Sequence, residues 1–521
     1  MTQRAPLLIA LPHGLNASGV TTWAVRLAST LAPAGRACGL ILHPEPPGQQ
    51  PMDLRPHPAV AVFDLRAMGP LDANAGAATA FVPAYRAAAR ALASRAGGGP
   101  VVLSPNLIGE CYAVAAELTR TDADAVRTIA VHHSDLAYND ALCLHFEPIV
   151  HAFVGVSGRI ADRLRRLLPA RAADAHRVPY GVETPPSPAH RPPLAGRPLR
   201  LLYAGRIEHE QKRVRALLAM SDALSARSIP HELALVGDGP ACAEIDAACA
   251  ERTGVRRLPP RSPAGVAALL DAADLFVLAS RYEGLSVSVL EAMAHGCAPV
   301  ITRTASGADE QITDGVTGFL VDAGPDADDA AIGEAMADGV QRAIRADPHA
   351  AGAAAAKRAR QAFSGERMAA AYAALIDACA AAPARRWPEG RPVAFTTVPT
   401  DAAERMRAVL ERLAGRRIIV HGAGRHTLEL AGVLADSPAC IVAFTDDDPA
   451  RQGGAIHGVP IVAPTDAALT GATDALISTF LHENAVWERR AVYERQGLRV
   501  HRLYGHSSGS EASSDLARSL T

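Results

Sequence analysis

The chain has 521 residues, which allows about three domains of ordinary size, and 49 % of them are hydrophobic, enough for several cores. Its formal net charge of −2 provides no overall positive field, so the composition argues against nucleic-acid binding through bulk charge. The eight cysteines show no C-x-x-C spacing, which favours buried thiols in a reducing compartment over disulfides or a zinc site.

Apolar runs in the sequence are short. The first, at residues 7–11, is too short for the core of a signal peptide, and no run reaches the roughly 20 apolar residues that span a bilayer. We therefore expect a cytoplasmic protein, either free or peripheral on the cytoplasmic membrane.

The first third of the chain alternates apolar strands with alanine-rich helical segments, the pattern of a parallel α/β domain. A strand at 7–11 is followed by a glycine loop at 13–20 and a helix at 21–31. Further strands are predicted at 37–42, 60–63, 101–103, 128–131 and 152–156. The glycine loop, which includes Gly19, lets the backbone approach a phosphate closely, although a plain tight turn explains it as well.

A proline-rich stretch at 184–198 cannot continue a helix or a central strand, so we place an interdomain linker there. The strand and helix pattern then repeats. Strands are predicted at 201–203, 231–236, 275–278 and 299–302, and a helix at 366–380 ends this second domain.

Two glutamates stand eight positions apart after the predicted strand at 275–278. Glu283 lies in a glycine loop, and Glu291 lies in a helix that Ser286 or Ser288 could start. The free amides of the helix start, from Gly284 and Leu285 onward, form an anion site suited to a diphosphate. Glu291, one layer deeper, suits the vicinal hydroxyls of a ribose. The alternative is chance spacing, since strand-loop-helix units are common.

Two basic side chains follow the strand at 201–203. Gly205 and Arg206 come directly after it, and Lys212 follows six positions later. An arginine can form two parallel hydrogen bonds to a diphosphate, and a lysine acts as a point charge. Both loops leave carboxyl ends of parallel strands, so we expect them to converge on one ligand.

These segments resemble the retaining glycosyltransferases of family 4, which have the GT-B fold. The resemblance rests on A-G-R-I-E-H-E-Q-K-R-V from Ala204, L-V-G-D-G-P from Leu235, and the block from Glu283 to Glu291 with its continuation A-M-A-H-G-C-A-P-V. It covers roughly residues 1–380. It implies an α/β architecture of two Rossmann-like domains facing a cleft, with the helix at 366–380 crossing back onto the first domain.

The resemblance also implies a reaction. A sugar would move from a nucleoside diphosphate sugar to a hydroxyl of an unidentified glycan, lipid or small molecule, with retention of anomeric configuration. Glu283 would position the sugar, and His133, or its neighbour His132, would contact the sugar or the acceptor. No protein nucleophile, metal or cofactor is expected. Alternatives are a sugar-nucleotide epimerase or phosphorylase on the same fold, or a non-catalytic scaffold acting through a third domain.

A third domain follows a proline-containing spacer at 383–399. A strand at 418–420 runs into a loop with Gly422 and Gly424, and Asp446 follows a second strand, which is a partial dinucleotide fingerprint. Thr427 replaces the third glycine. The segment resembles small Rossmann-like domains attached to some sugar-modifying enzymes. Nucleotide binding, a structural role and partner docking all remain open.

The expected domains are an acceptor-side domain at 1–190, a donor domain at 197–382, an accessory domain at 392–505 and a disordered tail at 506–521. One further feature is basic. Arg159, Arg163 and Arg166 share a face of a predicted helix, which suits an anionic membrane surface or a lipid phosphate, or is simply a solvated face. Ser157, before that helix, is either an acceptor-side serine or a helix cap.

Overall fold

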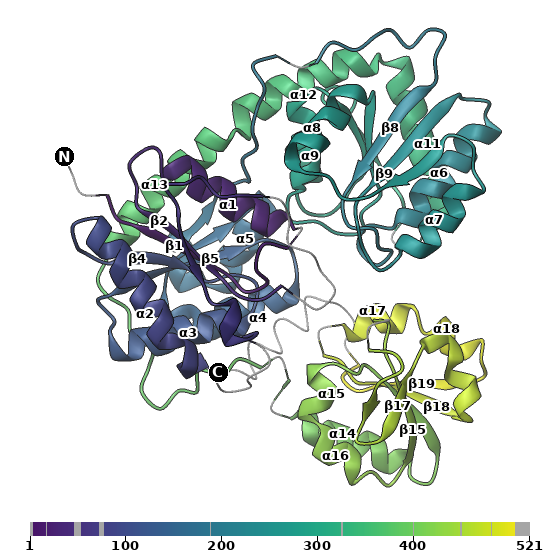
Figure 1. Ribbon diagram of the computed structural model, residues 1–521. Coiled ribbons are helices and arrows are strands. Elements are labelled where there is room, and N and C mark those ends of the chain that lie inside the picture. Colours follow the sequence, from purple (N-terminus) through teal and green to yellow (C-terminus); the bar gives the residue numbers. More distant parts are fainter. Residues whose placement is uncertain are drawn as a thin grey trace. The chain divides into compact units, whose positions relative to one another are not determined.

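The computed structural model describes residues 4–505 except residues 17, 46–53, 72–77, 188, 325–326, 397, 400, 449–450 and 481. The chain forms two compact units, which Figure 1 labels by their helices and strands. One unit consists of Met1–Asp135 and Phe146–Ala394, and the other of Leu136–His145 and Phe395–Thr521. The tail predicted at 506–521 lies outside the described residues.

The first unit contains two parallel sheets. The first sheet has seven strands in the order β3-β2-β1-β4-β5-β6-β7. They are β1 (Leu7–Leu11), β2 (Cys38–Leu42), β3 (Ala61–Asp64), β4 (Val101–Ser104), β5 (Val126–His132), β6 (Val150–Gly155) and β7 (Ala175–Arg177). The central strands are buried at every position, because helices cover both faces of a doubly wound sheet. Those helices are α1 (Gly19–Leu31), α2 (Ala78–Arg95), α3 (Gly109–Thr121) and α5 (Gly158–Leu167), with short 3-10 turns at Arg66–Met68, Glu147–Ile149 and Pro169–Asp174.

The second sheet has six parallel strands in the order β10-β9-β8-β11-β12-β13. They are β8 (Leu199–Ala204), β9 (His231–Val236), β10 (Val255–Leu258), β11 (Leu275–Leu278), β12 (Ala298–Thr302) and β13 (Phe319–Val321). Its helices are α6 (Val214–Ala226), α7 (Cys242–Ala250), α8 (Pro263–Ala272), α9 (Val287–Ala294), α10 (Ala308–Gln311), α11 (Asp329–Arg345) and α12 (Pro348–Ala362). The order reverses at β8, so the loops after β8 and β11 leave the sheet side by side, where ligands bind in such folds.

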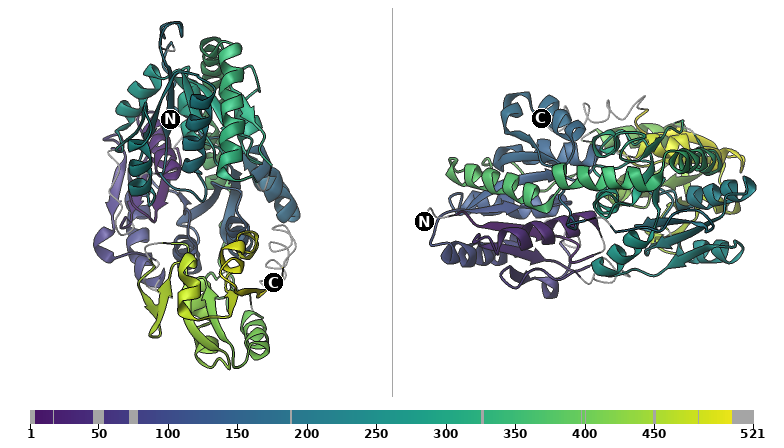
Figure 2. Two further views of the ribbon diagram at one scale, coloured as in Figure 1. Left: turned by 90° about the vertical axis from the view of Figure 1, so that its right-hand side faces the viewer. Right: turned by 90° about the horizontal axis from the view of Figure 1, so that it is seen from above.

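The helix α13 (Gly365–Ala381) returns to the first sheet, as expected. Arg36, just before β2, donates from both guanidinium NH2 groups to the carboxylate of Asp377 on α13, each at 2.9 Å. The rings of Trp23 on α1 and Tyr372 on α13 lie 5.8 Å apart. The successive helices α12 and α13, green in Figure 1 and in the two further views of Figure 2, therefore connect the two halves of the unit.

The segment after α13 is packed structure up to Ala394, whereas the sequence predicted a spacer from residue 383. Trp387 is fully buried, with its ring 5.4 Å from that of Phe146. Its backbone N–H donates to the hydroxyl of Thr119, and its indole N–H donates to the carbonyl of Arg391. Proline density therefore misled the prediction, because a large aromatic side chain anchors the segment.

The second unit is built on a third sheet in the order β16-β17-β15-β14-β18-β19, parallel except for the β16 and β17 pair. Its strands are β14 (Arg417–His421), β15 (Cys440–Thr445), β16 (Ala455–Ile456), β17 (Val459–Val462), β18 (Asp474–Ile477) and β19 (Arg499–Arg502). Its helices are α14 (Ala402–Arg412), α15 (Arg425–Glu429), α16 (Ala431–Ala435), α17 (Glu483–Glu488) and α18 (Ala491–Glu494), with a 3-10 turn at Pro464–Thr470. The predicted fold class, with three α/β sheets, is confirmed.

One helix of the second unit comes from far away in the sequence. The helix α4 (Ala137–Phe146) follows β5 in the chain, yet its residues up to His145 belong to the second unit. The rings of Tyr138 and His145 lie 5.6 and 5.5 Å from that of Phe395. No helix in the described part of the chain is long and apolar enough to cross a membrane.

Candidate functional site

The loop after β8 is shaped by hydrogen bonds within it. Glu208 is buried, and its carboxylate accepts the backbone N–H groups of Gln211 and Lys212 at 2.8 to 3.2 Å. Tyr203, at the end of β8, donates its hydroxyl to the carbonyl of Arg206 at 2.5 Å. These bonds turn the chain sharply, so that Lys212 points back over the carboxyl end of the sheet.

The loop after β11 is held against this first loop. The side chain of Gln211 donates to the carbonyl of Tyr282 at 3.0 Å, and the N–H of Arg281 donates to the carbonyl of Gln211 at 2.7 Å. The ammonium of Lys212 lies 2.5 Å from Oε1 of Glu283, and the Ser280 hydroxyl donates to the same oxygen at 2.7 Å. Two residues 71 positions apart in the sequence thus form one charge pair at the strand ends.

Arg206 is the other predicted cation of these loops. Its side chain is exposed and forms no ion pair with any residue in the described ranges. It lies close to Tyr282, whose pKa burial raises to about 12 while the charge of Arg206 acts in the opposite direction. The site therefore contains one cation paired with Glu283 and one that no carboxylate of the described residues holds.

The start of α9 supplies the expected amides, with one exception. Ser286 precedes the helix, and its N–H donates to Oε1 of Gln311 at 3.3 Å, while the Gln311 side chain donates back to the Ser286 carbonyl at 2.7 Å. The predicted anion site from Gly284 onward therefore shares one of its amides with a protein acceptor. Gly284 itself lies against the first half of the unit, because a Cβ there would collide with the carbonyl oxygen of His133.

The glycine loop of the first domain faces the same helix. Ser18 caps α1 by accepting the N–H of Thr21 at 3.2 Å, and Asn16 accepts both of their hydroxyls, at 3.0 and 2.8 Å. This network fixes the loop before Gly19, where a Cβ would lie 3.5 Å from Val287 at the start of α9. The structure thus brings the helix starts of α1 and α9 together.

Both ring nitrogens of His133 are hydrogen-bonded within the protein. The Asn106 amide group donates to the carbonyls of Ala10 and Ser104 at 3.0 and 2.9 Å, so its oxygen is the acceptor that lies 3.1 Å from Nε2 of His133. Nε2 must then carry the proton, and Nδ1 accepts from the hydroxyl of Tyr180 at 2.7 Å. A hydrogen bond from this ring to a substrate would require one of these two bonds to break.

The same surroundings keep the His133 ring neutral. Trp23 packs edge-on against it, with ring centroids 4.8 Å apart. Burial lowers the pKa of His133 to about 3, and the charge of His132 acts in the same direction. His132 is itself buried, at 3 % exposure. His133 is therefore not a proton carrier near neutral pH in this geometry.

Glu291 lies one turn into α9 and is paired across the unit. Nη2 of Arg26 on α1 lies 2.5 Å from its Oε1. The sequence predicted this carboxylate as a ribose acceptor and did not foresee a protein cation at one of its oxygens.

In the second unit, the acidic residue of the partial fingerprint is hydrogen-bonded by its own chain. Asp446 accepts the N–H of Ala423 at 2.7 Å and that of Asp448 at 2.9 Å, and Nη1 of Arg451 lies 3.3 Å from it. Thr427 donates its hydroxyl to the carbonyl of Gly422, which explains why a threonine fits where a third glycine was expected. Gly424 lies against Arg451, whose guanidinium a Cβ there would crowd. A ribose at Asp446 would have to share the carboxylate with these contacts.

The basic helix face is only partly neutralised within the protein, because two of its three arginines share a single carboxylate. Both Arg159 and Arg163 pair with Asp135, at 2.6 and 2.8 Å, whereas Arg166 is exposed. Ser157 caps α5 through the N–H of Ile160, which supports the helix-cap alternative. Within the ranges that the structure describes, no three histidine, cysteine or acidic side chains are grouped so as to hold a metal ion.

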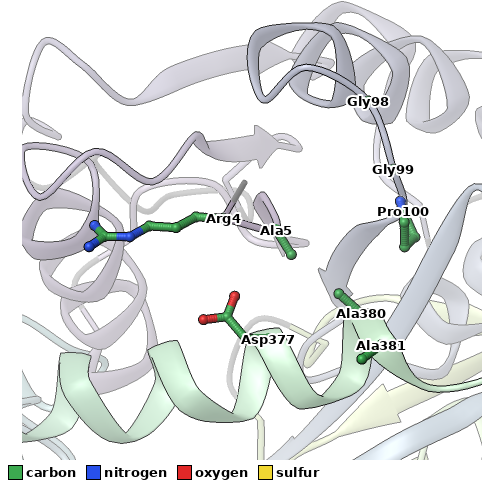
Figure 3. Close-up of a pocket in the computed structure, with 8 residues that line it drawn as sticks. All are labelled: Arg4, Ala5, Gly98, Gly99, Pro100, Asp377, Ala380 and Ala381. Atoms are coloured by element: carbon green, nitrogen blue, oxygen red, sulfur yellow. The ribbon is translucent and has the colours of Figure 1, made fainter. Parts of the chain in front are cut away.

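A pocket of about 480 Å³ lies elsewhere, between α13 and the amino ends of β1 and β4 (Figure 3). It is lined by Arg4, Ala5, Gly98, Gly99, Pro100, Asp377, Ala380 and Ala381. The site described above lies at the carboxyl ends of the strands, so this pocket belongs to the opposite edge of the first sheet. Its one carboxylate, Asp377, is already paired with Arg36.

Comparison with solved structures identifies the architecture of the first unit. Sucrose-phosphate synthase from Thermosynechococcus elongatus superposes with a TM-score of 0.55 at 19 % identity, covering 71 % of this chain and 98 % of that one. HepE of Anabaena, in complex with UDP and glucose, gives 0.54 at 14 % identity, covering 72 % and 100 %. The fold is GT-B. The sheet of the second unit lies outside this fold and is an addition to it.

Sequence comparison agrees for the second half of the GT-B unit. Residues 198–342 match the family described as Glycosyl transferases group 1. The alpha-D-kanosaminyltransferase of Streptomyces kanamyceticus is 29 % identical over 187 residues, which are 33 % of this chain and 47 % of that protein. The chain thus aligns with about half the length of this curated relative.

Some residues of the GT-B site carry no strong signal in the sequence. Ser280 orients Glu283 and stands three positions before it, a serine-to-glutamate spacing that could have drawn attention. Gln211 stands between the charged residues Glu210 and Lys212, and its uncharged side chain gives no sequence signal of its own. Arg26 follows Gly19 by seven positions, two helical turns, but nothing in the sequence indicates that this face of α1 meets α9.

Proposed function

We propose that the protein is a glycosyltransferase that moves a sugar from a nucleoside diphosphate sugar to an acceptor hydroxyl with retention of configuration. The observation that supports this most directly is the contact between Lys212 and Glu283 at 2.5 Å, with Arg206 exposed beside it. A cation held by a carboxylate and a second, available cation at the strand ends suit a ligand that combines a sugar with a diphosphate.

The chemistry follows from where charge develops. As the bond to the anomeric carbon breaks, negative charge grows on the leaving diphosphate, and Arg206, Lys212 and the free amides of α9 stabilise it. The carboxylate of Glu283, held by Ser280, lies beside the sugar and offsets positive charge near the anomeric carbon. The leaving phosphate takes the acceptor proton on the same face. No protein nucleophile is required, in contrast to the paired carboxylates of retaining glycosidases.

The comparisons support a sugar nucleotide as donor. The structure of HepE contains UDP and glucose, and the curated relative transfers kanosamine. We infer that the acceptor binds on the first domain, beside the loop that contains Gly19. All the proposed donor residues lie in the GT-B unit, so the second unit is an accessory domain of the transferase.

A thermal-shift panel of nucleoside diphosphates tests this proposal. A ligand at a hundred times its Kd stabilises the folded protein by roughly 2.7 kcal/mol, which raises Tm measurably. We expect at least one of UDP, GDP, ADP and dTDP to raise Tm, and the matching sugar nucleotide to lose its sugar to an acceptor, detected by mass spectrometry. An absence of any shift across the panel would contradict the proposal, and isomerisation of the sugar without transfer would favour an epimerase.

Transfer should also continue in the presence of EDTA. Arg206 and Lys212 supply the positive charge that a divalent ion otherwise gives to a diphosphate, and neither of the first two domains has an Asp-x-Asp at a strand end. The measurement is the transfer rate with EDTA, with magnesium and with manganese. A rate that EDTA abolishes and either metal restores would show that a bound cation takes part.

A further inference from the structure

Two buried serines connect the two halves of the GT-B unit beside the proposed donor site. The hydroxyl of Ser157, which caps α5 in the first domain, lies 2.8 Å from that of Ser306 in the loop after β12. The Ser306 hydroxyl also lies 2.8 Å from the carbonyl oxygen of Gly284, in the loop that leads into α9. The two serines are 0 % and 2 % exposed, so bulk water does not reach these bonds. A continuous chain of hydrogen bonds therefore runs from the first domain to the loop after β11.

The direction of each bond in this chain is fixed. A carbonyl can only accept, so Ser306 donates its one hydroxyl proton to Gly284. Ser306 must then accept from Ser157, whose oxygen still accepts the N–H of Ile160. Ser157 thus serves as a helix cap and as a donor at the same time. The hydroxyl of Thr304 donates to the carbonyl of Ser306 at 2.8 Å and holds that residue in place.

The loop that leads into α9 is held at its other end by α10. The side-chain amide of Gln311 binds both the N–H and the carbonyl of Ser286. Together with Ser306, it therefore fixes the path of the backbone into the helix. The amides of Val287 and Ser288, the first two of α9, take no hydrogen bond from the part of the chain that the structure describes. Their position is thus set by bonds that leave both of them open to a ligand.

A second contact holds the segment after β12 against the first domain. Glu310 of α10 accepts the N–H of Gly158, the first residue of α5, at 2.6 Å, and Arg177 donates to the same carboxylate at 2.9 Å. A Cβ at Gly158 would lie only 3.2 Å from this carboxylate, so the two halves fit closely here. The segment that carries Ser306, Glu310 and Gln311 therefore contacts the first domain and the donor loop at once.

We propose that Ser306 is a positioning residue for the donor diphosphate, and that Ser157 makes its effect depend on contact between the two halves of the GT-B unit. The Ser306 hydroxyl orients the peptide that leads into α9, which places the amides of Val287 and Ser288 for a diphosphate. When the two halves separate, Ser306 loses the bond from Ser157, and the loop is held less firmly. This inference rests on the proposed function, because it requires a diphosphate in the site.

Isothermal titration calorimetry on the full chain tests the role of Ser306. The probes are the tightest binder among UDP, GDP and ADP, its parent nucleoside, and inorganic pyrophosphate. We expect Ser306→Ala to weaken binding of the nucleoside diphosphate and of pyrophosphate by the same factor, roughly 2- to 10-fold, which is the scale of one net hydrogen bond. Nucleoside affinity should not change. Ser306→Thr keeps the hydroxyl and should bind all three probes as wild-type protein does.

A double-mutant cycle tests the link to the first domain. Ser157→Ala should weaken binding of the nucleoside diphosphate in the wild-type background and have no further effect in the Ser306→Ala background. Because Ser157→Ala also removes a helix cap, the matched control is Ser262→Ala, which removes the cap of α8 at an exposed serine. This control should leave the affinities for all three probes unchanged.

The outcomes separate the two proposals. If wild-type protein binds no nucleoside diphosphate, the proposed function fails and this inference fails with it. If it binds one, the positioning role alone is overturned by any of three results: unchanged binding in Ser306→Ala, equal losses in Ser306→Ala and Ser306→Thr, or a nucleoside affinity that falls together with that for pyrophosphate. Additive losses from Ser157→Ala and Ser306→Ala would show that the two serines act independently, which overturns the link to the first domain.

Discussion

Replacing Lys212 by alanine should lower the rate of sugar transfer roughly 100- to 1000-fold, the scale seen when one preorganised charge donor is removed from an active site. The substitution removes a cation from beside the leaving diphosphate. It also leaves the carboxylate of Glu283 without its partner at 2.5 Å, so the loop after β11 would keep a negative charge facing an anionic ligand. The loss should therefore fall mainly on kcat, measured under saturating donor.

The chain offers a matched control, because its only other lysine is Lys357, which is exposed on α12. Lys357→Ala should leave transfer unchanged. Arg206→Ala should cause a loss of the same order as Lys212→Ala, since each supplies positive charge to the same diphosphate. Near-normal turnover in both Lys212→Ala and Arg206→Ala would show that the diphosphate binds elsewhere.

Ending the chain at Ala382 should strongly destabilise the GT-B unit. The shortened protein would lack Trp387, which is fully buried against Phe146. Removing a buried tryptophan side chain costs about 3 to 5 kcal/mol, a large part of the 5 to 15 kcal/mol that holds a typical domain folded. Tm and urea unfolding of the isolated unit measure the effect. A large loss would place the end of the GT-B unit beyond residue 382, where the proline-containing spacer was predicted to begin.

Ending the chain at Ala394 is the matched comparison. This protein keeps Trp387 and every proposed donor residue, so it should give the same thermal shift with a nucleoside diphosphate as the full chain. The substitution Trp387→Ala in the full chain should reproduce most of the loss seen at Ala382. Equal stability of the two shortened proteins would contradict the role of Trp387, and loss of donor binding at Ala394 would show that the second unit contributes to the site.

How far the sequence predicts this fold depends on how each strand is buried. The strand at Leu7–Leu11 was predicted at its observed bounds, because every residue is apolar and buried. The strand Val255–Leu258 escaped prediction, since two arginines occupy its centre at the edge of the sheet. Local pattern therefore identifies central strands and misses short or charged edge strands.

Local sequence pattern also fails to predict those contacts of the site that join distant parts of the chain. Convergence of Lys212 and Glu283 could be expected, because both follow carboxyl ends of strands in one sheet. The pairing of Arg26 with Glu291 depends on how two domains meet. The hydrogen bonds of His133 with Asn106 and Tyr180 depend on how three separate segments pack. No spacing in the sequence encodes either arrangement. The proposed contact between His133 and a sugar thus remains a prediction that resemblance alone supplies.

The membership of α4 in the second unit has a consequence for biosynthesis. A ribosome makes Tyr138 and His145 about 250 residues before it makes Phe395, the ring against which both pack. At 5 to 20 residues per second, this helix waits on the order of 10 to 50 s for its partner. Its aromatic face is thus unburied throughout the time in which the GT-B unit is completed. During that wait the nascent chain exposes this helix to chaperone capture or aggregation, so completion of the C-terminal domain also completes the folding of a segment that is made much earlier.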